Sequence, residues 1–329
     1  MPVANRADAF DRAPPTPCWL GVQMTDCSII VCTRNRLEAL QPCLASIIQA
    51  VGAADDARCE IVVIDNGSTD DTARWAADYL SQAAVAFRVE REERPGLAAA
   101  RNAGVRCASG RILVFTDDDC RLTPDYVRKA LHHHATDAAP VMRGGRVDLG
   151  DARDLPFTVI ADPRPRRYDP AQKTQSLGGF ILGCNMSAPK ALLEAVGPFD
   201  ERFGVGAPFR AAEDTDYLYR IHLAGFGVEY VPDMVIRHHH GRRSVGELRR
   251  VIDYYNEGEG AIYAKYLFGP RAFFRQLRWD FRDALAETLM RRPIRDVFGV
   301  GKLTKLRSNA VGFWRYLTYS GVGPERPGF

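Results

Sequence analysis

Three consecutive aspartates, Asp117 to Asp119, directly follow the apolar run ILVFT. A short apolar run of this kind predicts a fully buried strand, and such a strand ends where the sheet meets water or a ligand. Because three adjacent carboxylates repel one another, a positive partner is expected there, unless the stretch is only a solvated turn. A divalent cation would be suitable, since hard cations prefer carboxylate oxygen and can bridge to a diphosphate.

A second acidic pair, Glu213 and Asp214, comes directly before a pattern typical of an amphipathic helix. The residues that suit one face of this helix are Tyr217, Leu218, Ile221 and Leu223. The pair is therefore expected at the helix N-terminus, where negative charge is favoured. Capping of the first turn is one interpretation, and a chemical role is the other.

A third candidate is the stretch DNGSTDDT, which begins at Asp65. Asp65 closes the apolar run EIVVI, and Gly67 permits a turn. The residues that suit turn and cap positions before the next helix are Ser68, Thr69 and Asp70. A carboxylate at a strand end is well placed to accept a hydrogen bond from a base or a ribose, so we predict a nucleotide contact for Asp65.

The elements that must position these residues alternate between strand and helix. Strands are predicted for CSIIVCT, EIVVIDN, FRVERE and RILVFTDDD, and helices for residues 37–51, 70–81 and 97–107 between them. Such alternation predicts an α/β fold with a mainly parallel central sheet and helices on both faces. In open sheets of this kind ligands bind at the carboxyl ends of the strands, so the polar strand ends are expected to form one site.

The turn after the first predicted strand, in CTRNRLEAL, contains no glycine. The chain has no GxGxxG after this strand and no P-loop motif, so a dinucleotide-binding fold or a P-loop enzyme is poorly supported. A sugar nucleotidyltransferase would also show a glycine-rich, basic loop at this position. Phosphates must then be neutralised in another way, for which a cation at the three aspartates is suited.

The chain of 329 residues is 46% hydrophobic and 26% charged, which is ordinary for a globular protein. Its eight cysteines form no CxxC pair, so we predict reduced thiols and a cytoplasmic location. No apolar run suits a membrane-spanning helix, and the N-terminal residues do not resemble a signal peptide. The net charge of +3 is uneven, because residues 242–329 hold 17 Lys and Arg against 9 Asp and Glu.

Six segments occur in an order and spacing that are together more specific than any single motif. They are IVCTRNR, EIVVIDNGSTDDT, PGLAAARNAGVRCASG, ILVFTDDD, GGFILGCNMSAPKALLEAVGPFDERF and AAEDTDYLYRIHLAGF. Together they resemble the family 2 glycosyltransferases, which have the Rossmann-like GT-A fold. The resemblance implies a GT-A catalytic domain at residues 26–240, after a lead-in at 1–25 and before a basic, mainly helical extension at 241–329.

The resemblance also implies a nucleotide-sugar donor, in the first place a UDP-sugar, and Mn²⁺ or Mg²⁺ as cofactor. Asp117 and Asp118 would bind the nucleotide, and Asp117 and Asp119 the metal. The other residues implied in nucleotide binding are Thr33, Arg34, Asn35, Asp65 and Asn66. His238 or His240, in the run HHH, would complete the metal site, with a solvated loop as the alternative for this run.

In the same resemblance Asp214 is the base that deprotonates the acceptor hydroxyl, and Glu213 orients. A single base on the face opposite the leaving nucleotide would give inversion at the anomeric carbon. Gly183 and Asn185 would lie near the donor sugar and the acceptor, with a buried structural role as the alternative for Asn185. The implied enzyme is an inverting, metal-dependent glycosyltransferase of the hexosyltransferase type.

Alternatives remain open at this stage. The fold could belong to a non-catalytic nucleotide-binding scaffold or partner protein, or to a sugar nucleotidyltransferase. The acceptor could be a glycan, a lipid-linked saccharide or a small molecule, and the chain could form a homo-oligomer. No nucleic-acid partner is predicted.

The C-terminal extension has an apolar residue at every fourth position of a basic segment. The row is Phe273, Leu277, Phe281, Leu285 and Leu289. Arginines flank this row, which predicts an amphipathic helix. Packing on the catalytic domain or on a second subunit is one interpretation, and peripheral contact with an anionic membrane is the other. A separate run of histidines, at 132–134, matches no motif and is predicted to lie at the surface.

Overall fold

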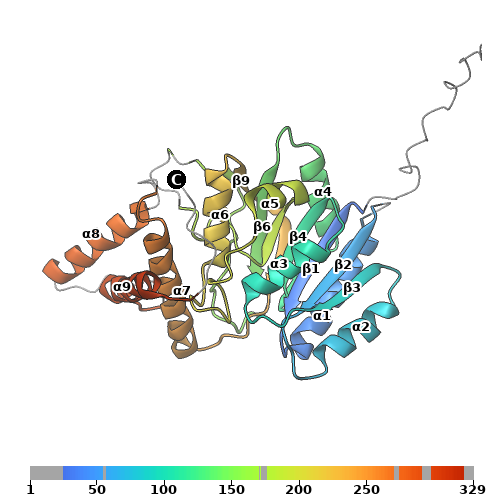
Figure 1. Cartoon of the computed structure of the whole chain (residues 1–329), viewed down its shortest axis with the longest axis horizontal. Coiled ribbons are helices and arrows are strands. Elements are labelled where there is room, and N and C mark those ends of the chain that lie inside the picture. Colours follow the sequence, from blue (N-terminus) through green and yellow to red (C-terminus); the bar gives the residue numbers. More distant parts are fainter. Residues whose placement is uncertain are drawn as a thin grey trace, which may run out of the picture.

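The structure of the protein, a computed structural model, describes residues 25–54, 57–169, 171, 176–269, 274–290 and 298–321. Within these residues nine strands form a single sheet, and helices cover its faces (Figure 1). This architecture confirms the predicted α/β fold with a mainly parallel central sheet and a C-terminal helical extension. In the same described ranges, no helix is both long and apolar enough to cross a membrane.

The first half of the sheet is parallel and follows the predicted alternation. Its strands are β1 (Cys27–Thr33), β2 (Cys59–Asp65), β3 (Ala86–Arg91) and β4 (Ile112–Asp117). The helices between them are α1 (Leu37–Gly52), α2 (Thr72–Ser81) and α3 (Leu97–Cys107). Because side chains alternate along a strand, Ile29 and Val31 of β1 share a core with α1 and α2, while Ile30 shares the opposite core with α3.

The second half of the sheet is mixed. Its strands are β5 (Cys120–Leu122), β6 (Val141–Leu149), β7 (Arg166–Arg167), β8 (Asn185–Pro189) and β9 (Gly227–His238). Its helices are α4 (Tyr126–Ala135), α5 (Lys190–Val196) and α6 (Glu213–Leu223). The order across the sheet is β3-β2-β1-β4-β8-β6-β9-β5, with β7 paired to β9 outside this path.

The registers of the strand pairs bring the polar strand ends to one edge of the sheet. Thr33 lies opposite Asp65, and Cys32 lies opposite Asp117. β5 begins directly after the three aspartates and runs antiparallel to β9, which sets Cys120 opposite His238. This pairing brings a histidine from late in the chain next to the aspartates.

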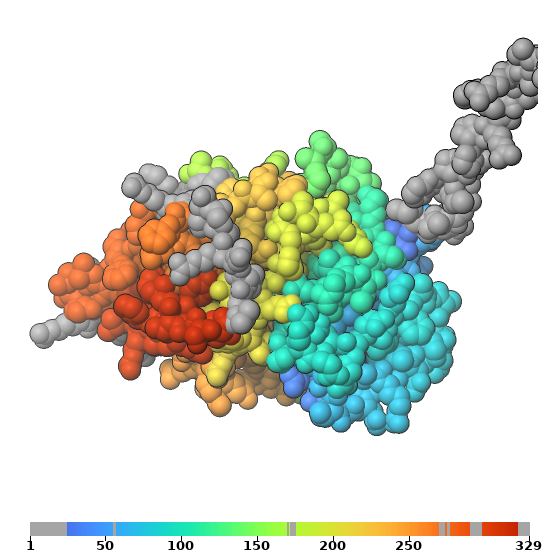
Figure 2. All heavy atoms as spheres, viewed as in Figure 1, coloured from blue at the N-terminus to red at the C-terminus, as the bar shows by residue number. Residues whose placement is uncertain are grey.

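Three C-terminal helices follow β9, namely α7 (Val245–Lys265), α8 (Arg275–Met290) and α9 (Lys302–Thr318). α7 begins with a capping box, in which the side chains of Ser244 and Glu247 each accept the backbone N–H of the other residue. α7 and α9 approach closely, because a Cβ added to Gly260 would lie 1.9 Å from the carbonyl oxygen of Asn309. In the space-filling view of Figure 2, α8 and α9 (orange and red) form one end of the molecule.

Three side chains of the predicted apolar row of the extension are exposed in the described structure, whereas Leu277 is half-buried. Phe281, Leu285 and Leu289 of α8 are 62%, 60% and 74% exposed, and Phe273 lies outside the described residues. Packing of this row on the catalytic domain is therefore wrong for these three side chains. Contact with a second subunit or with an anionic membrane stays a prediction.

The surface location predicted for the histidine run at 132–134 is wrong for His134. Its Nε2 lies 2.9 Å from the Ser187 hydroxyl on β8, and its Nδ1 lies 3.2 Å from the Arg143 guanidinium on β6. Burial and the charge of Arg143 lower the pKa of His134 to about 4. The error arises because α4 packs on the sheet, so the last turn of this helix has one face turned toward β6 and β8.

Candidate active site

The polar strand ends line a cavity of about 630 Å³, a volume typical of small-molecule sites. The predicted residues that line it are Thr33, Arg34, Asn66, Asp117, Asp118, Asp119, Gly183, Glu213, Asp214 and His238. The predicted residues that do not line it, as far as the structure describes the chain, are Asn35, Asp65, Asn185 and His240. The acidic motifs of β4 and α6 therefore share one cavity.

The positive partner expected at the aspartates is Arg36. Its terminal nitrogens lie 2.8 Å from an oxygen of Asp118 and 2.7 Å from an oxygen of Asp119. The Thr33 hydroxyl also donates to Asp118, at 2.7 Å. One guanidinium and one hydroxyl thus hold two carboxylates side by side. Sequence reasoning did not single out Arg36, although this residue belongs to the polar end of the first strand.

A second arginine, Arg101 on α3, joins the two acidic motifs. Arg101 is buried, and its guanidinium lies 3.3 Å from Asp117 Oδ1 and 2.9 Å from Glu213 Oε1. A buried charge needs partners of opposite sign, which here come from β4 and from α6. Sequence reasoning missed Arg101 as well. The sequence did contain one indication. Arg101 lies in the run AAARNAG, whose small residues favour a tightly packed helix, so a charged residue there is expected to be buried.

The three aspartates have different pKa shifts. Burial raises the pKa of Asp118 to about 7, although the charge of Arg36 opposes this. Burial also raises the pKa of Asp117, with Arg101 opposing. For Asp119, burial alone would raise the pKa, but the hydrogen bond from His238 and the charges of His238 and Arg36 hold it well below its usual value. Asp119 therefore keeps its negative charge most firmly.

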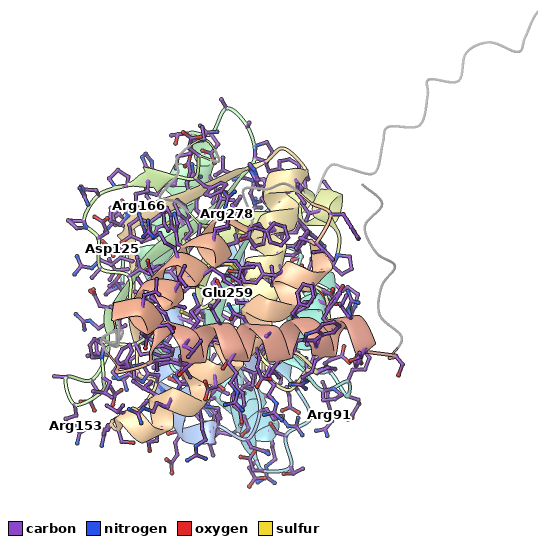
Figure 3. The ribbon with its side chains drawn as sticks, turned by 90° about the vertical axis from the view of Figure 1, so that its left-hand side faces the viewer. Arg91, Asp125, Arg153, Arg166, Glu259 and Arg278 are labelled. Carbon is purple, nitrogen blue, oxygen red and sulfur yellow. The ribbon has the colours of Figure 1, made fainter. Side chains whose placement is uncertain are left out.

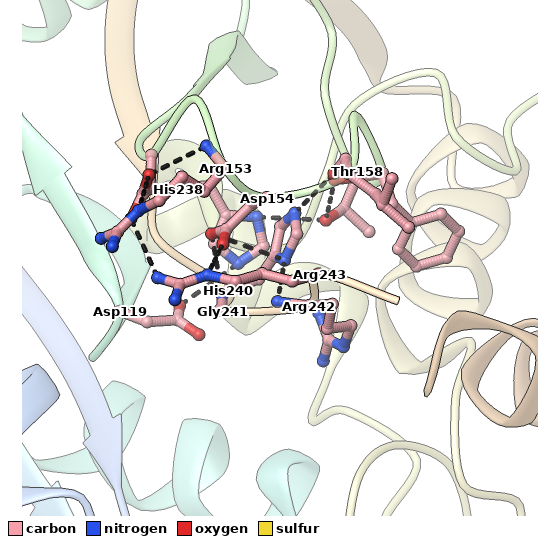
Figure 4. Close-up of polar contacts among 12 residues, drawn as sticks. Asp119, Arg153, Asp154, Thr158, His238, His240, Gly241, Arg242 and Arg243 are labelled. Atoms are coloured by element: carbon pink, nitrogen blue, oxygen red, sulfur yellow. Dashed lines mark hydrogen bonds and ion pairs between the residues drawn. The ribbon is translucent and has the colours of Figure 1, made fainter. Parts of the chain in front are cut away.

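His238, at the end of β9, lies against Asp119 (Figure 4). Its Nε2 is 3.3 Å from Asp119 Oδ1, and its Nδ1 is 3.1 Å from the Thr158 hydroxyl oxygen. That hydroxyl donates to the carbonyl oxygen of Phe157 at 2.7 Å, so its oxygen is free to accept the Nδ1–H of His238. Burial alone would lower the pKa of His238, but the hydrogen bond to Asp119 and the nearby negative charges raise it to about 9.

The backbone of Thr158 is strained. Its φ is 52°, in the left-handed region that a β-branched residue rarely adopts. Such strain persists only where the surrounding structure imposes it, and it concentrates at functional sites. Thr158 also lines the cavity, so the segment around it is part of the site.

The ring of His240 forms hydrogen bonds with the backbone of neighbouring segments and not with the aspartates (Figure 4). Its Nε2 donates to the carbonyl oxygen of Leu155 at 3.0 Å, and its Nδ1 accepts the backbone N–H of Arg242 at 3.0 Å. Both ring nitrogens are thus taken by backbone groups, whereas Nε2 of His238 points to Asp119. Of the two predicted histidines, His238 has the geometry of a metal ligand, and that role stays a prediction.

A metal ion could be held by Asp119, Cys120 and His238, whose ligand atoms lie within 4.8 Å of one another. Burial raises the pKa of the Cys120 thiol well above its usual value, which keeps the thiol protonated and makes it a poor ligand. A carboxylate and an imidazole remain, and His238, whose pKa is raised to about 9, would have to release its proton to bind a cation. The hydrogen bond to Thr158 would orient His238 in the way that metal-binding histidines require.

Glu213 and Asp214 begin α6, as predicted. Asp214 Oδ2 accepts the backbone N–H of Gly183 at 3.0 Å. A Cβ at Gly183 would lie 2.8 Å from the Arg101 guanidinium, so a side chain at this position would displace the guanidinium. Burial and the charge of Asp214 raise the pKa of Glu213. The preceding residue, Ala212, has a left-handed backbone with φ 71°, a second strained position beside the cavity.

Asp216, in the first turn of α6, has a structural position. It is fully buried and lies 2.6 Å from the Lys265 ammonium and 3.2 Å from Arg220. The Tyr266 hydroxyl donates to it at 2.9 Å. Asp216 therefore ties α6 to the C-terminal end of α7 and does not face the cavity.

Asn35 and Asp65 stabilise the turns beside the cavity. Asn35 has φ 51°, and its side-chain oxygen accepts the backbone N–H of Thr69 at 2.7 Å. Asp65 is fully buried, accepts the backbone N–H of Ser68 at 3.1 Å, and pairs with Arg91 at 3.1 Å. Both residues thus connect the ends of β1, β2 and β3. Their predicted contacts with a nucleotide remain predictions.

Three arginines line the cavity without a carboxylate partner in the described part of the chain. They are Arg34, Arg210 and Arg242. Arg34 was predicted to bind the nucleotide, whereas the other two were not singled out. Guanidinium groups that face a cavity without an acidic partner are suited to phosphate oxygens.

Asn185 is fully buried in the sheet, and its amide is saturated. Its oxygen accepts the Tyr126 hydroxyl at 2.6 Å, and its nitrogen donates to the carbonyl oxygens of Arg146 at 3.0 Å and Met234 at 3.1 Å. These bonds join β8 to β6, β9 and α4. Of the two roles predicted for Asn185, the structural one fits this position.

The family model described as Glycosyl transferase family 2 matches residues 28–197, which is just over half of the chain. The chain belongs to glycosyl transferase family 2. This finding confirms the resemblance seen in the sequence, and the fold is the GT-A fold expected for the family. The matched range includes the three aspartates and Arg101 and ends before α6 and the C-terminal helices.

Two relatives and one solved structure illustrate the similarity. The chain is 25% identical over 254 residues to the glycosyltransferase AglE of Haloferax volcanii, covering 77% of this chain and 79% of the relative. It is 32% identical over 224 residues to validoxylamine A glucosyltransferase of Streptomyces hygroscopicus subsp. jinggangensis, covering 60% of this chain but only 51% of the relative. A mannosyltransferase from Pyrobaculum calidifontis, solved with GDP-Man and Mn²⁺, aligns with a TM-score of 0.62 at 19% identity, covering 90% of this chain and 88% of that one.

Proposed function

We propose that this family 2 glycosyltransferase moves a hexose from a nucleoside-diphosphate sugar, in the first place a UDP-sugar, to an acceptor hydroxyl. The transfer inverts the anomeric carbon and uses a divalent cation. The observation that carries the proposal is one cavity that holds both the three aspartates and Asp214, joined by the buried Arg101. The hexose donor agrees with the glucosyl and mannosyl transfer named for one relative and for the solved neighbour.

Asp214 takes the proton of the acceptor hydroxyl in this proposal. Its two oxygens accept the backbone N–H groups of Gly183 at 3.0 Å and of Thr215 at 2.6 Å, and these bonds fix the direction of the carboxylate. Glu213 is paired with Arg101, and its role in this proposal is to hold the start of α6 in place. It does not take the proton of the acceptor. Because Glu213 is paired with Arg101, Asp214 acts as the single base in this proposal, and the displacement is direct and inverting.

The donor diphosphate is bound between cationic groups of the chain. Arg34, Arg210 and Arg242 supply guanidinium donors, while Arg36 keeps Asp118 and Asp119 together. Asp119 and His238 are the residues that would hold the cation. When bound there, Mn²⁺ or Mg²⁺ supplies positive charge that stabilises the leaving diphosphate.

The test is the rate of nucleotide release from a panel of UDP- and GDP-hexoses with Mn²⁺, for the wild type and for Asp214→Asn. We expect Asp214→Asn to lower the rate at least about a hundredfold, the usual contribution of a general base. Asp125→Asn is the matched control, because it makes the same change at the start of α4, away from the cavity. Full activity in Asp214→Asn would show that the base is another group. A wild type that binds a donor but turns none over would favour the non-catalytic nucleotide-binding scaffold.

A further inference from the structure

The cavity has a second wall, which the C-terminal helices build. The residues of α7 and α9 that line it are Tyr255, Asn256, Glu259, Ile262, Tyr263 and Lys305. All of them lie outside residues 28–197, the range that the family model matches. This wall, called here the α7 wall, faces the same cavity as Asp214 and the aspartates.

Asn256 carries an unused donor at this wall. The residue is 7% exposed, and its side-chain nitrogen is buried without a hydrogen-bond partner in the part of the chain that the structure describes. Buried amides are nearly always hydrogen-bonded. Among the described residues, Asn256 and Asn309 both have a buried amide without a partner, but Asn256 alone of the two lines the cavity, where a ligand can supply one. The partner must offer a hydrogen-bond acceptor, as a hydroxyl or a carbonyl oxygen does.

Tyr255 is the neighbour of Asn256 and lies close to the catalytic acids. Its ring stacks on Phe157, with centroids 5.5 Å apart and an interplanar angle of 19°, and the side chain is 41% exposed. Burial of its hydroxyl and the negative charge of Asp214 raise the pKa of Tyr255. The hydroxyl is thus close enough to the Asp214 carboxylate to be affected by its charge, while the rest of the ring is open to a ligand.

The charged residues of the α7 wall neutralise one another. Glu259 accepts the Tyr263 hydroxyl at 2.8 Å and pairs with the Lys305 ammonium at 3.1 Å. Figure 3 shows Glu259 among the C-terminal helices, on the side of the molecule that they cover. A wall with an internally paired charge, a free amide and an aromatic ring suits a neutral, hydroxyl-rich ligand better than an ion.

Close packing fixes this wall relative to the base. A Cβ at Gly258 would lie 3.0 Å from the carbonyl oxygen of Ala211, in the segment that leads into Glu213 and Asp214. On the other side of α7, Gly260 and Gly312 allow the backbones of α7 and α9 to touch. The distance between Tyr255 and Asp214 is therefore set by backbone packing, as a site that aligns an acceptor requires.

We infer that Tyr255 and Asn256 form the acceptor subsite and that the acceptor group bound there is a saccharide. The Asn256 amide donates to a sugar hydroxyl, the Tyr255 ring covers the C–H face of the sugar, and a second hydroxyl of the same sugar reaches Asp214. The inference rests on the proposed transfer reaction, because that reaction places a hydroxyl at Asp214. The saccharide can be free or attached to a lipid, and the chemistry recognised by the α7 wall is the same in both cases.

The test is saturation-transfer NMR with methyl glycosides of glucose, galactose, mannose and N-acetylglucosamine, in the presence of UDP and Mn²⁺. The variants are Tyr255→Ala and Asn256→Leu, and the latter replaces an unpaired buried amide with an apolar group of similar size, which the fold should accept. The matched controls are Tyr79→Ala, which removes a tyrosine stacked on the Trp75 ring of α2, and Asn309→Leu, and neither position lines the cavity. Octyl glycosides of the same sugars distinguish a lipid-linked acceptor from a free one.

We expect at least one glycoside to bind the wild type and both controls, and to lose at least tenfold in affinity with each α7-wall variant. The same variants should affect UDP affinity much less than sugar affinity. Undiminished sugar binding in both variants, or no sugar binding to the wild type, would overturn the inference. Failure of the proposed function is a different result, because donor turnover and UDP binding are measured without any sugar acceptor.

Discussion

The two walls of the cavity are built in different ways. The wall formed by β1 and β4, called here the donor wall, consists of contiguous polar residues at strand ends that the sheet register brings together. The α7 wall consists of single side chains on a helix, placed by glycine contacts and by the ion pairs of Lys265. The comparison teaches that compensated buried charge lies within the donor wall itself, whereas the α7 wall is positioned by backbone packing and by buried ion pairs at the end of the helix.

The largest expected effect concerns the charge that joins the donor wall to α6. Arg101→Met removes the common partner of Asp117 and Glu213 and leaves two poorly solvated carboxylates. We expect a loss of about 3–5 kcal/mol in the free energy of unfolding, measured by urea denaturation. Arg106→Met, an exposed position on the same helix, should change it by less than about 0.5 kcal/mol. Equal stability of the two variants would refute the charge account of the donor wall.

A smaller and pH-dependent effect is expected where α7 is attached. Burial alone would raise the pKa of Asp200, but hydrogen bonds from Arg202 and Lys265 and their charges hold it well below its usual value. Since the folded pKa is depressed, this stabilisation is present above about pH 4 and is lost as the pH falls through the folded pKa. Asp200→Asn should therefore lose about 2 kcal/mol at pH 7, with a difference from the wild type that shrinks below pH 4. A difference that stays constant from pH 7 to pH 2 would contradict this.

A change of one methyl group tests the packing of the α7 wall. Gly260→Ala would bring a Cβ to 1.9 Å from the backbone of α9, so we expect a loss of about 1–3 kcal/mol. Gly246→Ala on the same helix meets nothing within 4 Å and should be neutral or stabilising. Thermal unfolding of both variants gives the answer. If Gly260→Ala were as stable as Gly246→Ala, α7 and α9 would not be in the close contact described.

The donor wall could largely be predicted from the sequence. Apolar runs that end in polar residues predict both the strands and the common edge, and the resemblance of six ordered segments indicated which acids share the site. What periodicity could not predict is pairing between distant segments. The salt bridges of Arg36 and Arg101 follow from the packing of α1 and α3, and the choice of His238 over His240 follows from the pairing of β5 with β9.

The α7 wall could not be predicted at all from motifs. Asn256 and Glu259 lie in YYNEGEGAIYAK, which reads as an ordinary helix with two glycines. Their exposure to a cavity depends on the crossing of α7 with α9 and on the contact of Gly258 with Ala211. The same limit explains the error on His134, since local pattern does not show which helix face meets the sheet.

The smallest expected effect concerns the exposed apolar row of α8. If this row contacts an anionic membrane, the protein should co-sediment with vesicles that contain phosphatidylglycerol at low salt and be released by salt. Replacing Phe281 and Leu289 with serine should weaken sedimentation severalfold. If the wild type stays in the supernatant, the predicted membrane contact is wrong, and contact with a second subunit is the prediction that remains for this row.

The central claim is that the donor wall holds a nucleotide diphosphate through a divalent cation at Asp119. The most direct measurement is a thermal-shift series with UDP, GDP, CMP and dTDP, each with and without Mn²⁺, on the wild type and on Asp119→Asn. A ligand at a hundred times its Kd stabilises the fold by about 2.7 kcal/mol, which gives a clear shift in Tm. The account predicts that one nucleotide raises the Tm of the wild type only when Mn²⁺ is present, and that Asp119→Asn does not respond. A wild type that responds to no nucleotide, or an Asp119→Asn variant that responds equally well, would contradict it.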